Sequence, residues 1–178
     1  ENSKVSVLSY DIKSHKTRTL AVPLPTEGYI PRIKATDDAN RIIVYTMNRH
    51  QDELSLYAVN PYSTVSQLLV KEKVDKYIKE DAMNNILITS NHIVIPSDRS
   101  GHMQLYLYSQ NGNFERQLTT GNNDVTRLYG YDETTGTVYY QAAGYDAMNR
   151  EIYSSDKKGR VNKLANYHGW NDAVFSKN

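Results

Sequence analysis

Short runs of alternating apolar and polar residues follow one another along this chain, and polar turns separate them. The turns are rich in Gly, Asn, Asp and Ser, which supply the positive φ angles and local hydrogen bonds of tight turns. Alternation with a period of two is typical of a strand with two unlike faces. Alternation is clearest at residues 54–59 and 103–108, and further apolar, strand-like runs lie at residues 41–45, 92–96 and 137–141. The pattern therefore predicts an all-β chain built of hairpins.

One strand motif, a hydrophobic residue followed by tyrosine, returns at a regular distance. It stands at Tyr57, Tyr106 and Tyr153, with a weaker copy around Leu8, and these positions are 49, 49 and 47 residues apart. Each copy runs from a strand through a polar turn into the tyrosine strand, then through a second turn into a short leucine-containing strand. Four short strands at a period of about 40–50 residues are typical of one β-propeller blade.

We therefore predict a partial β-propeller with about three four-stranded antiparallel blades and partial blades at both ends. The whole blades are expected at residues 29–70, 77–121 and 124–165. Residues 1–28 would end a preceding blade, and residues 167–178, with a run from Gly169 to Ser176, would start the next one. No stretch shows sustained helical periodicity, and the charged residues 71–76 are expected to form an exposed connection rather than a helical turn. Open blade edges are expected to drive self-association.

Composition narrows the classes of partner. The formal net charge is +1, from 21 basic and 20 acidic residues, which argues against binding to nucleic acid or to an anionic membrane. The absence of cysteine excludes disulfides and thiolate metal sites, and no apolar run is long enough to span a membrane. The 15 tyrosines suit half-buried strands.

Because the chain starts on Glu1 instead of Met, we expect it to be a piece of a longer protein.

Three features carry a family resemblance, one in each of the predicted whole blades. Residues 95–108 read I-P-S-D-R-S-G-H-M-Q-L-Y-L-Y, and residues 117–121 read Q-L-T-T-G. A Pro-bearing segment, Tyr29–Arg32, begins a blade, and T-V-Y-Y-Q-A at residues 137–142 precedes Glu151-Ile152-Tyr153. In this order the segments resemble the propeller of bacterial dipeptidyl peptidase IV-like enzymes in the prolyl oligopeptidase clan, over nearly the whole chain.

The resemblance implies a two-part serine exopeptidase. In that family a β-propeller caps an α/β-hydrolase domain that holds the Ser-Asp-His triad, and a pair of propeller glutamates grips the free amino terminus of the peptide. Dipeptides are removed, usually after Pro or Ala. The expected partners are the hydrolase domain of the same parent chain and a peptide substrate. The expected location is extracytoplasmic, in the bacterial periplasm or cell envelope.

The residues themselves supply no complete active site. A hydrolase nucleophile needs a G-x-S-x-G elbow, which the sequence lacks, and Ser100 lies in a predicted hairpin turn. No Glu-Glu pair occurs. The resemblance implies, from the position of the pair in the family, that it lies upstream of residue 1. The acidic pairs Asp37-Asp38 and Glu80-Asp81 are expected in solvated hairpin turns. The five histidines lack the spacing of metal ligands, so no catalytic residue, metal or cofactor is predicted.

One segment is expected to touch the substrate. In the family, an aromatic and a basic side chain line the extended substrate site where the blade after residues 29–70 begins. The corresponding stretch here is residues 76–80, in which Tyr77 offers a stacking face and Lys79 a cation. The family commonly has Arg nearby, and Lys lacks its fork-shaped donor group. The alternative for this stretch is an ordinary inner strand with solvated charges.

Three function classes compete at this level. The first is the non-catalytic propeller part of a dipeptidyl peptidase IV-like enzyme, which gates and orients peptides. The second is a non-enzymatic propeller scaffold of the bacterial cell envelope, which the repeat supports equally well. The third is a carbohydrate-active propeller enzyme, which requires inward-facing carboxylates on several blades, and no motif for these is present.

Overall fold

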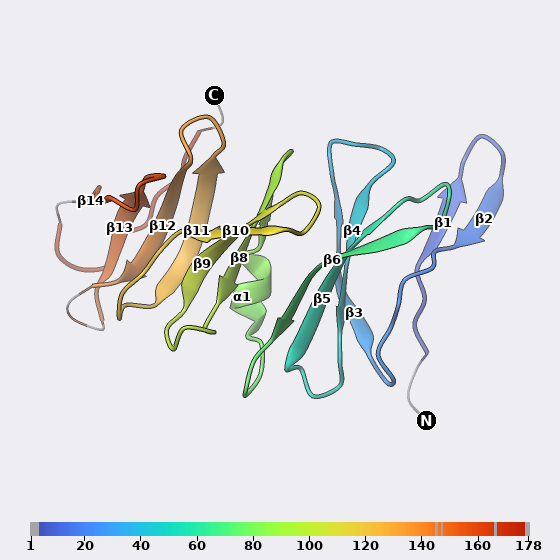
Figure 1. The fold of residues 1–178 in the computed structure, drawn as a ribbon, viewed down its shortest axis with the longest axis horizontal. Coiled ribbons are helices and arrows are strands. Elements are labelled where there is room, and N and C mark those ends of the chain that lie inside the picture. Colours follow the sequence, from blue (N-terminus) through green and yellow to red (C-terminus); the bar gives the residue numbers. More distant parts are fainter. Residues whose placement is uncertain (1–3, 145, 147, 166, 177–178) are drawn as a thin grey trace. The chain divides into compact units, whose positions relative to one another are not determined.

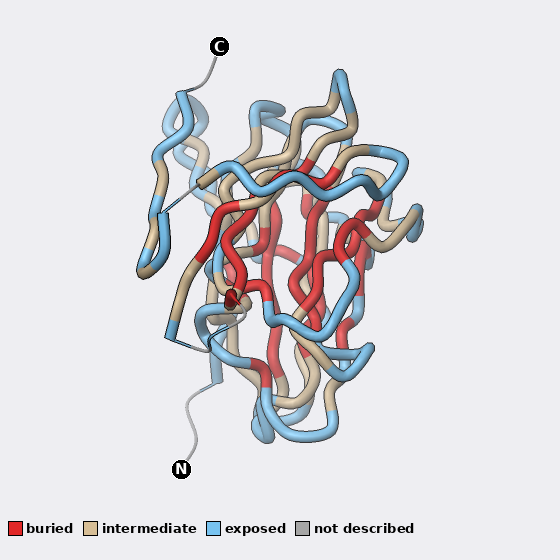
Figure 2. The backbone as a smooth tube through the Cα atoms, turned by 90° about the vertical axis from the view of Figure 1, so that its left-hand side faces the viewer, coloured by how far each residue is buried: buried red, intermediate tan, exposed pale blue. Residues whose placement is uncertain are grey.

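The computed structural model describes residues 4–144, 146, 148–165 and 167–176 (Figure 1). Within these ranges the chain consists of β-strands and a single five-residue helix. It divides into two compact units, residues 1–78 and 79–178. The buried positions lie mostly in the strands and the exposed positions mostly in the turns, and Figure 2 colours them red and pale blue along the backbone.

The first unit contains a hairpin and one four-stranded sheet. The hairpin pairs β1 (Leu8–Asp11) with β2 (Lys16–Thr19). The sheet is an antiparallel meander in the order β3 (Tyr29–Ala35), β4 (Ile42–Met47), β5 (Glu53–Val59) and β6 (Ser66–Lys73). Val7 and Leu20, which flank the hairpin, pack against Val44 and Val59 of the sheet.

The second unit contains two four-stranded antiparallel meanders. The first, which we call the helix-side blade, follows α1 (Glu80–Asn84) and consists of β7 (Leu87–Ile88), β8 (His92–Ser97), β9 (Gln104–Ser109) and β10 (Phe114–Gln117). The second, which we call the tail-side blade, consists of β11 (Val125–Asp132), β12 (Thr137–Ala143), β13 (Arg150–Ser155) and β14 (Val161–Lys163).

A shared apolar core joins these two blades. Leu105 and Leu107 of the helix-side blade belong to the same buried cluster as Val138 and Tyr140 of the tail-side blade. Both leucines and Val138 are at most 2% exposed, so this contact is dry and removes large apolar surfaces from water. Packing one sheet face on the next in this way is the arrangement of successive propeller blades.

The repeat predicted from sequence is present in the strands. Tyr57, Tyr106 and Tyr153 occupy the third strand of their sheets, in β5, β9 and β13. The prediction of an all-β partial propeller with four-stranded antiparallel blades is therefore confirmed.

One prediction and one alternative interpretation around the end of the first sheet are wrong. Residues 71–73 belong to strand β6, where Lys71 pairs with Ser55 and its ammonium lies 2.8 Å from the Glu53 carboxylate. The stretch 76–80 forms no inner strand, because the inner strand β7 begins only at Leu87.

The acidic pairs have different outcomes. Asp37-Asp38 lies in the turn between β3 and β4, as predicted. Glu80-Asp81 forms the first turn of α1 instead of a hairpin turn. Acidic side chains are favourable there, because the N-terminus of a helix carries partial positive charge.

The described part of the C-terminal segment, residues 167–176, forms no strand. Trp170 makes an isolated parallel bridge with Arg150, whose N–H donates to the Gly169 carbonyl at 3.0 Å. Phe175 contacts the rings of Tyr129 and Tyr139, with centroids 5.3 and 5.1 Å away. A strand needs a continuous pairing partner. Apart from the bridge to Arg150, the segment is held by side chains of the tail-side blade.

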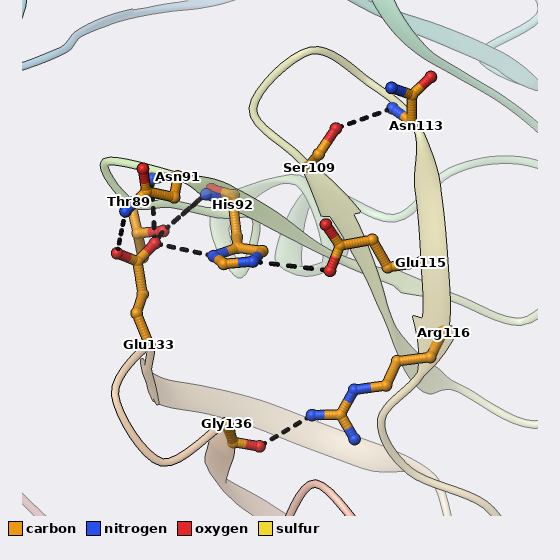
Figure 3. A network of polar contacts seen from close by, with 9 residues as sticks. All are labelled: Thr89, Asn91, His92, Ser109, Asn113, Glu115, Arg116, Glu133 and Gly136. Carbon is orange, nitrogen blue, oxygen red and sulfur yellow. Dashed lines mark hydrogen bonds and ion pairs between the residues drawn. The ribbon is translucent and has the colours of Figure 1, made fainter.

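A polar network joins the two blades of the second unit at the β7–β8 and β11–β12 turns (Figure 3). The Glu133 carboxylate accepts hydrogen bonds from the hydroxyl of Thr89, from the backbone and side-chain amides of Asn91, and from the His92 ring. The other ring nitrogen of His92 lies 3.5 Å from a Glu115 oxygen. Arg116 of β10 donates to the Gly136 carbonyl at 2.8 Å. The two blades are thus fixed together by their core and by polar contacts at this end.

Candidate functional site

A hollow of about 520 Å³ lies in the second unit, at the end of β11 opposite to Glu133. Both blades contribute to it. The lining comes from α1 and the residues that flank it, from the ends of β8, β12 and β13 and the residue before β9, from the start of β11, and from the C-terminal segment. These residues are Lys79, Asp81, Ala82, Asn85, Pro96, Met103, Asp124, Val125, Thr126, Arg127, Leu128, Gln141, Arg150, Trp170 and Asp172.

Helix α1 brings one wall of charged and polar groups to the hollow. Lys79 precedes the helix in an extended conformation, and its carbonyl accepts hydrogen bonds from the N–H groups of Ala82 and Met83. The buried side chain of Met83 fixes the opposite side of the helix. Lys79 and Asp81 therefore reach the hollow from a short element that is anchored by burial.

The start of β11 supplies a second wall. A side-chain nitrogen of Arg127 lies 2.7 Å from Asp172, and the Tyr129 hydroxyl donates to the same carboxylate at 2.6 Å. The hydrogen bonds from Tyr129 and the Ala173 N–H, together with Arg127, hold the pKa of the Asp172 carboxyl below its usual value. Burial and the neighbouring Asp172 carboxylate raise the pKa of Tyr129 to about 12. Asp172 is therefore ionised and already engaged at neutral pH.

Trp170 and Arg150 form an aromatic and cationic corner. The Arg150 guanidinium carbon lies 5.0 Å from the centre of the Trp170 ring, which is a cation–π geometry. The side chain of Gln141 donates to the Asn171 carbonyl at 2.6 Å, and the Asn171 amide donates to the Arg150 carbonyl at 2.9 Å. Trp170 is held at its backbone while 70% of the residue stays exposed, so its ring is accessible to a ligand.

Asp124 lines the hollow at the point where the two blades meet. Its carboxylate accepts a hydrogen bond of 2.8 Å from the N–H of Met103, at the end of the β8–β9 turn. The N–H of Val125 donates to the Met103 carbonyl at 2.8 Å as well. These contacts tie the start of β11 to the helix-side blade.

The two residues predicted to contact substrate are placed differently. Lys79 lines the hollow. Tyr77 is 58% exposed, belongs to the first unit and is not among the lining residues. Their roles toward a substrate stay predictions. The sequence analysis did not single out Arg127, Arg150 or Trp170 as contact residues. The single tryptophan, which stands in the run predicted to start the next blade, is the one signal that could have pointed to this end of the chain.

Neither a cluster of metal-ligand side chains nor a membrane-spanning helix occurs among the described residues. No three histidine, aspartate or glutamate side chains of this part of the chain gather closely enough to hold a metal ion. None of the helices in the described ranges is long and apolar enough to cross a membrane. The residues that line the hollow can bind a ligand through charge, hydrogen bonds and ring stacking.

Comparison with solved structures gives a close match. A dipeptidyl peptidase 4 from Porphyromonas gingivalis superposes with a TM-score of 0.91 and 37% identity, over 96% of this chain and 24% of that chain. A putative dipeptidyl aminopeptidase IV from Bacteroides ovatus has a TM-score of 0.69 at 22% identity, over 88% of this chain and 25% of that chain, and supports the fold alone.

Comparison with curated proteins agrees. A probable dipeptidyl peptidase 4 from Emericella nidulans is 26% identical over 162 residues, 85% of this chain and 21% of the relative. An inactive dipeptidyl peptidase 10 from Mus musculus is 38% identical over 48 residues, 27% of this chain and 6% of the relative. The chain thus spans about a fifth to a quarter of the longest-matching relatives. The family model described as the dipeptidyl peptidase IV (DPP IV) N-terminal region matches residues 1–178, and the chain therefore belongs to this family.

Proposed function

We propose that this chain is the non-catalytic propeller part of a dipeptidyl peptidase IV-like serine exopeptidase, which removes dipeptides from the amino terminus of peptides. One observation carries the proposal: 96% of the chain superposes on a dipeptidyl peptidase 4 at 37% identity, while it covers only 24% of that protein. The acyl transfer then belongs to an α/β-hydrolase domain elsewhere in the same parent chain.

In this proposal the propeller orients the peptide, and the hollow supplies contacts to it. The hollow presents cations at Lys79, Arg127 and Arg150 and an exposed indole at Trp170. An extended peptide offers carbonyl oxygens and side chains that such groups bind by charge, hydrogen bonding and stacking. Binding groups that the fold holds in place lower the entropic cost of orienting a substrate before the reaction. We place the parent protein outside the cytoplasm, in a bacterial periplasm or cell envelope.

The proposal is tested with Gly-Pro-p-nitroanilide. The purified 178-residue chain is expected to release no nitroaniline, whereas the full-length parent protein is expected to release it. Replacing the serine of a G-x-S-x-G elbow in the parent by alanine should abolish the release. Turnover by the 178-residue chain alone contradicts the proposal. A parent protein that has no G-x-S-x-G elbow and does not turn over the substrate contradicts it as well.

A non-enzymatic scaffold is the second candidate function. It is favoured by the match to a relative that is itself named an inactive dipeptidyl peptidase, at 38% identity over 48 residues. A scaffold would keep the blades and bind a protein partner on one rim. In that case the parent protein carries the propeller and shows no turnover of Gly-Pro-p-nitroanilide.

A further inference from the structure

The side chain of Asn85 bridges two elements that carry the hollow. Asn85 is the C-cap residue of α1. Its side-chain nitrogen donates to the Asp81 carbonyl of its own helix at 2.9 Å. Its side-chain oxygen accepts a hydrogen bond of 3.0 Å from the backbone N–H of Leu128 in β11, on the neighbouring blade. One amide group therefore connects the helix-side blade to the tail-side blade at the hollow.

Strand β11 needs such a partner at this point. It is the edge strand of its sheet, and its pairing with β12 is irregular between Leu128 and Gly130. An edge strand leaves every second N–H outside the sheet, and a partly buried N–H without a partner costs free energy. Asn85 satisfies the Leu128 N–H and thereby fixes the position of the helix along the strand.

Helix α1 depends on outside contacts for its position. It has five residues, and no side-chain cap hydrogen bond forms at its N-terminus within the described part of the chain. Isolated helices shorter than about 12 residues are marginal in water, so a single turn is held by its tertiary contacts. These contacts include the buried side chains of Met83 and Ile86 and the bridge from Asn85.

We propose that Asn85 is a positioning residue, which locks α1 to β11 and so holds Lys79 and Asp81 in place relative to Arg127 at the hollow. This inference rests on the proposed function, in which the hollow contacts peptide residues. Asn85 itself lines the hollow, but its side-chain nitrogen and oxygen are already engaged by the Asp81 carbonyl and the Leu128 N–H. It therefore acts through Lys79 and the helix, by fixing the wall that they form. Loss of the bridge lets a one-turn helix shift and weakens the binding of peptides that are long enough to reach the hollow.

The experiment compares two substrates in the full-length parent protein. Gly-Pro-p-nitroanilide reports on the reaction centre, and a decapeptide that begins with Gly-Pro also extends beyond it. Asn85→Leu removes both hydrogen bonds and keeps the branched shape and the number of heavy atoms of the side chain. We expect the ratio of the KM for the decapeptide to the KM for Gly-Pro-p-nitroanilide to rise about fivefold, which is the size expected for the loss of one hydrogen bond. The kcat for each substrate should stay similar. Asn85→Asp keeps the acceptor for the Leu128 N–H and should restore most of the difference.

A matched control separates positioning from general stability. Glu133→Gln weakens the contact between the same two blades at the other end of β11. It is expected to lower the melting temperature and to leave the ratio of the two KM values unchanged. If Asn85→Leu does not fold, Asn85→Ser, whose side chain is too short for the bridge, takes its place.

Three outcomes overturn the inference. The first is an equal change of KM for both substrates in the Asn85 variants. The second is a rise of the KM ratio in Glu133→Gln as large as in Asn85→Leu. The third is an Asn85→Asp variant that behaves like Asn85→Leu. A parent protein that turns over neither substrate instead contradicts the proposed function, and the two failures are therefore distinguishable.

Discussion

The carboxylate of Glu133 accepts a hydrogen bond of 2.9 Å from the Nδ1 atom of His92, and so connects the first turns of two successive blades. Partial burial disfavours the charged carboxylate, but hydrogen bonds from Thr89, His92 and Asn91 outweigh it and lower the pKa of Glu133 to about 2. The ionised form is thus the one that the folded blades stabilise.

Acid is therefore expected to weaken this contact between blades. A carboxyl whose pKa is lowered on folding stabilises the native state above its ordinary pKa of about 4.3, and the stabilisation is lost as the pH falls toward 2. In thermal unfolding, Glu133→Gln should lower the melting temperature at pH 7 by about 5 °C. The difference from the unmodified chain should shrink between about pH 4 and pH 2. A difference that does not depend on pH contradicts this role of the Glu133 charge.

The repeat could be predicted from sequence because its signal is local. Tyr106 and Tyr153 stand in alternating runs, and a period of two reports a strand without knowledge of the partner strand. The turns carry their own signal as well. Gly101 and Gly159 have φ angles of 95° and 78°, which glycine adopts at no steric cost. Strands and turns of the blades thus follow from neighbours in the chain.

The helix and the hollow could not be predicted in the same way. Five residues are too few to show a helical period, so Glu80–Asn84 carried no pattern. The contact from Asn85 to Leu128 joins residues 43 positions apart, and that from Arg127 to Asp172 joins residues 45 apart. Long-range contacts of this kind leave no trace in local composition. Lys79 could be named only through the family resemblance.

Trp170 provides an internal reporter of the hollow, because it is the one tryptophan of the chain. Its ring is 70% exposed and lies 5.0 Å from the Arg150 guanidinium. Arg150→Met removes the cation from the ring and should raise the rate of fluorescence quenching by acrylamide about twofold, as a weak cation–π contact predicts. Arg160→Met, which changes a cation in the turn between β13 and β14, serves as the control. Equal quenching in both variants contradicts the contact.

The open edge of the first hairpin is expected to drive self-association of the 178-residue chain. Strand β1 pairs with β2 alone among the described residues, and Leu8 and Tyr10 on one face of it are each 58% exposed. Exposed apolar edge strands pair with other chains, and lysine on such an edge opposes this pairing. Sedimentation velocity should show dimers or larger species, and the double change Leu8→Lys and Tyr10→Lys should reduce them. Tyr62→Lys, at a similarly exposed residue in a turn, is the control. A monomer at high concentration contradicts the expectation.

Lys79 is expected to contribute directly to peptide binding, since it lines the hollow at the start of α1. In the full-length parent protein, Lys79→Met removes one cation at nearly constant side-chain length. The kcat/KM for a decapeptide that begins with Gly-Pro should fall about three- to tenfold, the range of one exposed hydrogen bond or ion pair. Tyr77→Ala should have a smaller effect, because Tyr77 is not among the lining residues. Lys76→Met changes a neighbouring exposed lysine that also lies outside the hollow, and it should leave kcat/KM unchanged. A loss at Lys76 equal to that at Lys79 would show that general charge near this segment, and not the place of Lys79 in the hollow, determines the binding.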